Sequence, residues 1–152
     1  ESFKVSRSLR LTIKKNIFET RFDTAFEQVI RSCAQRDETW ISEEIIAAYC
    51  ELFHLGFAHS VESWNNNKLV GGLYGVAVGA AFFGESMFST MKDASKTALV
   101  ALVEQLRSQQ FELLDTQYIT PHLLQFGTIE IPKNEYLRRL NSAVKKKRKF
   151  LY

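Results

Sequence analysis

The chain has 152 residues, enough for one domain with a sizeable core, and its 45% apolar and 24% charged residues are typical of a globular protein. This composition argues against disorder, and the longest apolar run, 69–83, is broken by glycines, which argues against a membrane span. The net charge is only +3, but the cations gather around 7–15 and 145–149, so both ends of the chain could hold a polyanion.

The first half of the chain predicts helices followed by strands. Ser6 and Ser42 are suitable N-caps, Asp23 or Thr24 could cap the helix between them, and Gly56 is suited to end the helix that Ser42 begins. The expected elements are a helix over 7–15, a strand over 18–22, helices over 24–34 and 42–55, and strands over 57–64, 69–78 and 80–83.

The three later strands are separated by short turn signals. Asn65-Asn66-Asn67 and Gly79 favour tight turns, so the strands predict an antiparallel meander. The second half then predicts a helix over 95–108, a strand over 111–118, a short helix over 121–127, a strand over 128–131 and a helix from Pro132 onward. The pattern contains no repeat, linker or second domain.

The cysteines and histidines do not form a pattern for metal binding. Cys33 and Cys50 are best interpreted as small apolar residues in a reducing cytoplasm rather than as a disulfide. His54, His59 and His122 are not at metal-ligand spacing with acidic or thiol partners, so we expect no metal.

Seven short segments together resemble one enzyme family. They are Thr39-Trp40-Ile41, Ala48-Tyr49, His59-Ser60-Val61-Glu62, Leu69-Val70-Gly71-Gly72-Leu73-Tyr74-Gly75-Val76, Gly84-Glu85-Ser86-Met87-Phe88-Ser89, Ala94-Ser95-Lys96-Thr97-Ala98-Leu99 and Leu114-Asp115-Thr116-Gln117. In this order and spacing they resemble the leucyl/phenylalanyl-tRNA–protein transferases over about residues 3–141. One segment alone would be a weak signal, but the set is specific.

The resemblance implies an α+β fold like that of the GNAT acetyltransferases, a mixed sheet with an antiparallel meander flanked by helices. It implies transfer of Leu, Phe or Met from aminoacyl-tRNA to the N-terminal Arg or Lys of a protein, which marks that protein for N-degron proteolysis. It further implies a bacterial, cytoplasmic monomer that needs no cofactor and no membrane. The transferase domain would span 1–141 and a basic tail 142–152.

The chain departs from the family pattern in three places. The family's N-terminal lobe before Val5-Ser6-Arg7 is missing, Leu73 stands where methionine is frequent, and the tail has no counterpart. A tRNA- or peptide-binding remnant without turnover is therefore the alternative function. An acetyl-CoA-dependent enzyme is disfavoured, because the stretch 91–96 has no glycine and Asp93 would repel a pyrophosphate.

Attack of an amine on an activated ester needs orientation and charge stabilisation rather than a covalent nucleophile. Asp115 and Gln117 lie two apart on an expected strand and so share a face, where a carboxylate can orient an ammonium or accept its proton. The resemblance places both in the catalytic site together with Glu85. From the residues alone, a solvated strand face and a surface turn acid remain the alternatives.

The resemblance also assigns the binding residues. Trp40 and Tyr49 would bind the 3′ adenosine by stacking, although they could equally be aromatic residues packed on the sheet. The pocket for the transferred amino acid would be formed by Leu73, Phe82, Leu102 and Leu114. Ordinary core residues would look the same.

The N-terminal basic residues are the candidate contact for the tRNA backbone. Phosphates are held by cations that share one exposed face, and the residues concerned are Arg7, Arg10, Lys14 and Lys15. A solvated basic helix is the alternative. The run 145–149 could enlarge this contact or be a disordered tail.

Overall fold

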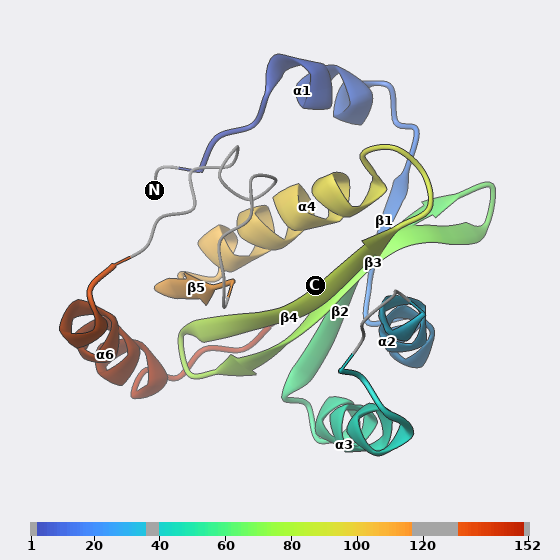
Figure 1. Ribbon diagram of the computed structural model, residues 1–152. Coiled ribbons are helices and arrows are strands. Elements are labelled where there is room, and N and C mark those ends of the chain that lie inside the picture. The colour runs from blue at the N-terminus through green and yellow to red at the C-terminus, as the bar shows by residue number, and fades with distance from the viewer. Residues whose placement is uncertain (1–2, 36–39, 117–130, 151–152) are drawn as a thin grey trace.

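The computed structural model describes residues 3–35, 40–116 and 131–150, and the account below concerns these residues. They form a single five-stranded sheet flanked by helices, which confirms the expected α+β fold (Figure 1). The strands follow one another across the sheet as β1 (Glu19–Phe22), β2 (Ala58–Asn65), β3 (Lys68–Val78), β4 (Ala81–Ser89) and β5 (Leu113–Asp115).

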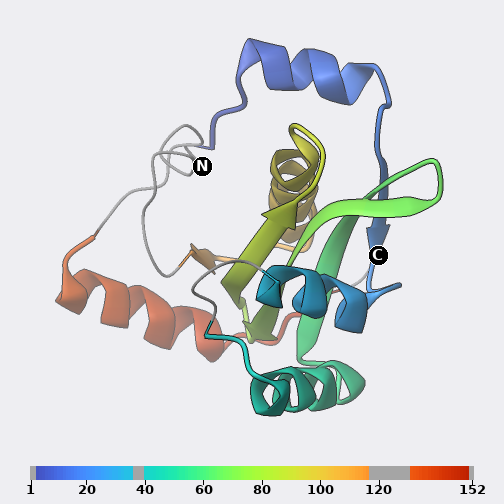
Figure 2. The same ribbon diagram turned by 45° about the vertical axis from the view of Figure 1, so that its right-hand side comes forward.

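The helices lie on both faces of this sheet and at one end of it. They are α1 (Arg7–Lys14), α2 (Phe26–Ala34), α3 (Glu43–His54), α4 (Ala94–Ser108) and α6 (Lys133–Val144). Figures 1 and 2 show α4 and α1 on one side of the sheet, α2 and α3 on the other, and α6 beside the turn between β3 and β4. No helix in the described ranges is long and apolar enough to cross a bilayer.

The strands from β2 to β4 form the expected antiparallel meander, and β1 pairs antiparallel with β2 at its edge. Asn66 and Asn67 have φ values of 50° and 64°, and this left-handed backbone makes the tight turn between β2 and β3. β4 runs to Ser89, well past the predicted end at residue 83. The longer strand arises because Gly84 and residues 86–89 still pair with β3.

Two of the three predicted N-caps are confirmed. The hydroxyls of Ser6 and Ser42 accept hydrogen bonds from the backbone N–H groups of Leu9 and Ile45. The prediction for α2 is wrong, since its N-cap is Ala25 and no side chain at that position caps the helix.

The carboxylate of Glu62 on β2 serves the N-terminus of α2 instead. It accepts the backbone N–H groups of Thr24 and Ala25 at 3.1 Å and 3.0 Å. A carboxylate at this position accepts two backbone N–H groups at the start of the helix, and its negative charge is stabilised by the positive end of the helix dipole. The local sequence around 23–25 could not indicate a cap supplied from β2.

The sheet separates two apolar layers. On one side, Leu9 of α1 and the inner face of α4 pack on Val61, Leu73 and Phe82. On the other, α2 and α3 cover Ala58, Tyr74 and Phe88. Cys33 is buried in this second layer and Cys50 packs against it, and the two are thiols rather than parts of a disulfide.

The C-terminal segment belongs to the same body. α6 continues past residue 141 to Val144, and Phe150 is only 7% exposed, with its ring against Phe22, His59 and Phe82. Between these two points lies the basic run 145–149. The predicted short helix over 121–127, and all but the last residue of the strand predicted over 128–131, lie outside the described residues.

Candidate functional site

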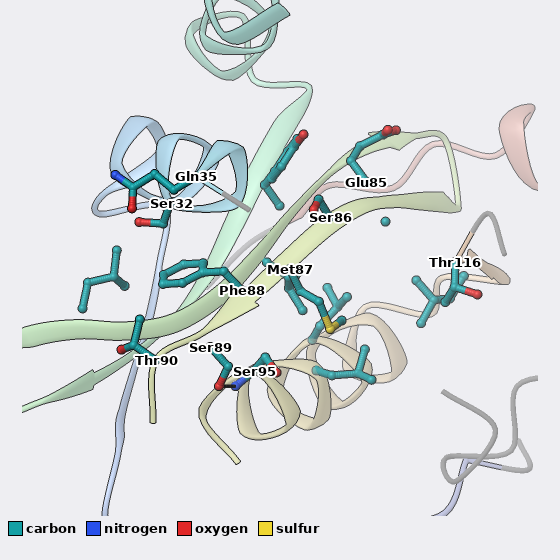
Figure 3. Close-up of a pocket in the computed structure, with 17 residues that line it drawn as sticks. Ser32, Gln35, Glu85, Ser86, Met87, Phe88, Ser89, Thr90, Ser95 and Thr116 are labelled. Carbon is teal, nitrogen blue, oxygen red and sulfur yellow. Dashed lines mark hydrogen bonds between the residues drawn. The ribbon is translucent and has the colours of Figure 1, made fainter. Parts of the chain in front are cut away.

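The sheet opens where β4 and β5 part. β5 pairs with β4 only from Leu113 to Asp115, whereas β4 continues to Ser89. A cavity of about 770 Å³ lies along this continuing part of β4, and Figure 3 shows the side chains that line it. A volume of this size suits a small-molecule ligand or one end of a larger one.

One part of the cavity wall is apolar. Leu73, Leu102 and Leu114, three of the four residues predicted for an amino-acid pocket, all line it, and Met87 and Leu99 complete this wall. Phe82 does not line the cavity. It is fully buried and packs in the layer between the sheet and α4. An apolar wall of this kind binds aliphatic or aromatic groups by shape and burial.

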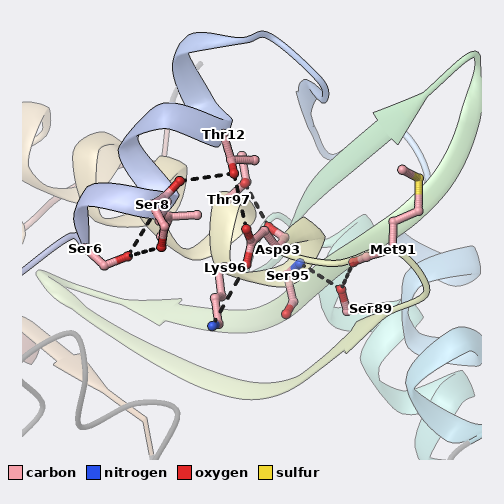
Figure 4. A network of polar contacts seen from close by, with 10 residues as sticks. Ser6, Ser8, Thr12, Ser89, Met91, Asp93, Ser95, Lys96 and Thr97 are labelled. Atoms are coloured by element: carbon pink, nitrogen blue, oxygen red, sulfur yellow. Dashed lines mark hydrogen bonds and ion pairs between the residues drawn. The ribbon is translucent and has the colours of Figure 1, made fainter.

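Another part of the wall carries hydroxyl groups, several of which come from β4 and from the start of α4. Ser89 links these two elements, because its hydroxyl donates to the carbonyl oxygen of Met91 at 2.7 Å and accepts the N–H of Ser95 at 3.2 Å. Figure 4 shows this network continuing to Asp93, whose carboxylate accepts the hydroxyl of Thr12 on α1. These contacts fix the start of α4 against both α1 and the cavity.

Glu85 reaches the site through a β-bulge. Tyr74 pairs with Ser86 and Gly75 with Gly84, so Glu85 is the extra residue in β4. A bulge re-aims a side chain and increases local twist. Glu85 lines the cavity at one end of the labelled residues of β4, and Ser89 lies at the other end, near Ser95 (Figure 3).

Tyr49 of α3 is the partner of Glu85. Burial, followed by the charge of Glu85 and a hydrogen bond to it, raises the pKa of Tyr49 to about 12. Burial also raises the pKa of Glu85, the hydrogen bond from Tyr49 lowers it, and the nearby negative charge of Asp115 raises it further. Burial and the nearby Asp115 together outweigh the hydrogen bond from Tyr49, so the pKa of Glu85 is raised overall.

Asp115 closes the described part of β5. Leu114 and Thr116 on either side of it line the cavity, so strand alternation turns Asp115 toward the other side of the sheet. There its Oδ2 accepts the hydroxyl of Tyr136 on α6 at 2.6 Å. Glu85 and Asp115 therefore lie within electrostatic reach of each other at the point where β4 and β5 separate. Gln117, predicted to share a face with Asp115, lies outside the described residues.

The two aromatic residues predicted to bind adenosine are placed differently. Tyr49 contacts the ring of Tyr74 at a centroid distance of 5.4 Å and lies beside Glu85. Trp40 precedes α3 and is 52% exposed, outside the wall of the cavity. An exposed indole is available for stacking, but the structure does not bring it together with the cavity.

The predicted tRNA-backbone residues are on the outer surface of α1. Arg7, Arg10, Lys14 and Lys15 are all exposed, while Leu9 points inward to the layer on α4. None of the four cations forms an ion pair within the described ranges. The helix therefore presents one basic face to solvent.

Sequence reasoning missed several residues of this site. Met87 and Ser86 stand in the quoted segment 84–89, and Leu99 in the segment 94–99, so strand and helix periodicity could have added them. Tyr136 had no such signal, because its position opposite Asp115 depends on how α6 packs against the sheet.

Comparison with known proteins gives the family. The model of the family described as "Leucyl/phenylalanyl-tRNA protein transferase" matches residues 1–141. A leucyl/phenylalanyl-tRNA–protein transferase of Herpetosiphon aurantiacus is 56% identical over 144 residues, which cover 95% of this chain and 75% of that protein. The enzyme of the same name from Paramagnetospirillum magneticum is 57% identical over 148 residues, covering 95% and 71%.

Solved structures with a similar fold include acetyltransferases. One from Clostridium acetobutylicum, solved with acetyl-CoA, superposes with a TM-score of 0.58 at 8% identity, over 76% of this chain and 92% of the other. An aminoglycoside acetyltransferase from an uncultured soil sample gives 0.53 at 13% identity, over 86% and 89%. These two likenesses concern the fold. The sequence matches show that the chain belongs to the leucyl/phenylalanyl-tRNA–protein transferase family and is an aminoacyltransferase.

Proposed function

We propose that this enzyme transfers Leu, Phe or Met from aminoacyl-tRNA to the N-terminal Arg or Lys of a protein. The observation that carries the proposal is the two-part site, in which a cavity with an apolar wall is also lined by Glu85, a carboxylate within electrostatic reach of Asp115. An uncharged amino-acid side chain suits the first part, and a cationic acceptor suits the second. The reaction joins the two substrates between them.

The apolar wall would bind the side chain of the donor amino acid. Met87 and the four leucines around it are flexible or branched at Cγ, so the wall can accept linear, branched and aromatic groups. Discrimination by an apolar pocket is modest for each methylene, which supports a mixed preference for Leu, Phe and Met. A charged side chain would lose its hydration there without gaining a partner.

The carboxylates would bind the acceptor. Two like charges near each other raise the energy of the empty site, and an arginine or lysine side chain placed beside them would offset that cost. The neutral α-amine then attacks the ester carbonyl. A C–N bond forms, the C–O bond to the tRNA ribose breaks, and the amine proton leaves with the aid of Asp115 or of the departing ribose oxygen. The ester is already activated, so the step requires no cofactor.

The tRNA would lie across α1. The exposed Arg7, Arg10, Lys14 and Lys15 supply a basic face for its phosphates, and Trp40 and Tyr49 would contact the terminal adenosine. Gln117 would assist at the ester or the amine. The product, a protein with a new N-terminal Leu, Phe or Met, would enter the N-degron route of proteolysis in the bacterial cytoplasm, and the enzyme would act as a monomer.

The test is a transfer assay with this chain. Labelled Leu, Phe, Met and Val are each loaded on tRNA and offered to peptides that differ only in an N-terminal Arg, Lys, Ala or Glu. We expect transfer of the first three to the Arg and Lys peptides, with Val and the other two peptides at least tenfold poorer. Binding of tRNA without any transfer would instead support the alternative of a binding-only remnant.

A further inference from the structure

Tyr136 of α6 makes a short hydrogen bond to Asp115. The distance from its hydroxyl to Oδ2 is 2.6 Å, within the range of a charge-assisted bond to a carboxylate. The hydrogen bond to Asp115, followed by burial and the charge of Asp115, raises the pKa of Tyr136 to about 12. The phenol therefore stays protonated and remains a donor at any pH at which the enzyme would work.

The face of α6 that carries Tyr136 is the face that packs on the sheet. Leu140 and Ala143 follow Tyr136 at i+4 and i+7, and both contact the turn region through Ala80 and Ala81. Tyr136 thus faces the body of the protein because the helix is docked by the residues that follow it.

The far end of α6 is held independently of Tyr136. The backbone N–H of Ala80 donates to the carbonyl oxygen of Ala143 at 2.8 Å. A Cβ at Gly79 would lie 2.5 Å from the carbonyl oxygen of Val144, so the turn and the helix touch backbone to backbone. Since this docking involves no part of Tyr136, the hydroxyl is not required to keep α6 in place.

Asp115 needs such a partner because it ends a very short strand. Within the described residues of this stretch, Leu113–Asp115 pair with β4 and Thr116 does not. A hydrogen bond from one side to Oδ2 restricts the rotation of the carboxylate and directs Oδ1 to a defined position. Tyr49 of α3 stands in the same relation to Glu85, which lies on the neighbouring strand β4.

We propose that Tyr136 is a positioning residue of the transferase, which fixes the carboxylate of Asp115 so that it meets the amine of the acceptor. The proposal rests on the function proposed above, in which Asp115 serves the acceptor. It adds a residue from α6, an element that contributes nothing to the described wall of the cavity. Tyr136 acts through Asp115 and does not itself touch the reacting atoms.

The first test is Tyr136→Phe in the transfer assay with an Arg peptide. Loss of orientation at a reacting group lowers the rate rather than binding, so we expect kcat to fall about 10- to 100-fold with the KM for aminoacyl-tRNA unchanged. Arg139→Gln is the matched control, because it removes an ion pair to Glu135 on the same helix without touching Asp115. A Tyr136→Phe enzyme with wild-type kcat overturns the inference, whereas a wild-type chain without transfer overturns the proposed function.

A double-mutant cycle shows whether Tyr136 acts only through Asp115. Adding Tyr136→Phe to Asp115→Ala should cause no further loss, since the partner is already gone. Additive losses would mean a role unrelated to Asp115 and would contradict the proposal.

Carboxyl carbon-13 NMR gives a readout that does not depend on activity. The Asp115 signal, assigned by its absence in Asp115→Ala, should shift in Tyr136→Phe and stay in place in Arg139→Gln. An unshifted signal would show that the hydrogen bond does not form in solution and would reject the proposal.

Discussion

Two acidic regions of this protein, one buried and one half-buried, differ in the donors and charges that surround their carboxylates. Glu62 on β2 is fully buried, and its carboxylate accepts hydrogen bonds from backbone N–H groups at the start of α2, from the hydroxyls of Thr24 and Ser60, and from the indole of Trp64. Glu85 and Asp115 lie at the opening between β4 and β5. There each carboxylate has a tyrosine donor, and each also lies near the negative charge of the other.

Under the proposed function, the difference separates an acid that serves the fold from acids that would serve a ligand. Around Glu62, donors from β2 and from the start of α2 converge, so its charge is satisfied before any substrate arrives. The pKa of Glu85 is raised by burial and by Asp115, which means that the folded protein resists its ionisation. A cation bound beside Glu85 and Asp115 would relieve this cost. Mutations should therefore lower stability in the first region and lower activity in the second.

The largest effect is expected for Asp115→Ala. If the carboxylate orients or deprotonates the amine, transfer to an Arg peptide should fall about 100- to 1000-fold. The thermal midpoint should change little, since the side chain is at the end of a three-residue strand. Glu112→Gln, just before the same strand, is the control, because Glu112 pairs with Lys146 away from the cavity. Unchanged transfer in Asp115→Ala would remove Asp115 from the reaction.

Glu62→Gln should show the opposite behaviour. A neutral amide cannot accept all the donors that now surround the carboxylate, and each buried donor left unsatisfied costs about 1–3 kcal/mol. We expect the free energy of unfolding, measured with urea, to fall by about 2–3 kcal/mol. Glu104→Gln on the exposed side of α4 should change it by less than about 0.5 kcal/mol. A Glu62→Gln protein as stable as wild type would undo the distinction between the two regions.

The sequence was sufficient for most of the fold because its signals are local. Ser6 and Ser42 cap their helices through atoms three residues away, and Asn66 and Asn67 make their turn with their own backbone. The cap of α2 could not be found in this way. It is supplied by Glu62, which stands 37 residues after Ala25 and reaches it only once β2 is in place.

For the same reason, only part of the candidate site could be predicted from the sequence. Leu73, Leu102 and Leu114 were named from a resemblance and do line one cavity, but Phe82 came from the same pattern and is core. Apolar periodicity does not distinguish a pocket wall from the layer behind it. The partner of Asp115, Tyr136, lies 21 residues further on, and only the docking of α6 on the turn at Gly79 brings the two together.

Glu85→Gln should lower activity while raising stability. The folded-state pKa of Glu85 is raised, so its contribution to stability is fully present below its unfolded-state pKa and is lost as the pH rises through the folded-state value. At neutral pH the charge therefore costs stability, and the neutral amide should unfold at a higher temperature than wild type. The difference should vanish in acid.

The same variant should transfer to an Arg peptide about tenfold more slowly, through a higher KM for the peptide. One of the two negative charges that would attract the cationic peptide is gone. A peptide with N-terminal Ala should be unaffected, which makes it the internal control. A lower thermal midpoint at neutral pH would show that Glu85, like Glu62, is an acid of the fold.

The smallest effect is expected on the surface, where charge is solvated and each contact is weak. Arg10→Gln on the exposed face of α1 should raise the KM for aminoacyl-tRNA about threefold and reduce the slope of log KM against log salt by about 1, since one phosphate contact is lost. Arg138→Gln makes the same change of charge on the exposed side of α6. Equal effects of both variants would mean that tRNA responds only to net charge. An effect confined to Arg10 would place the tRNA backbone on α1, on the side of the sheet that α4 covers.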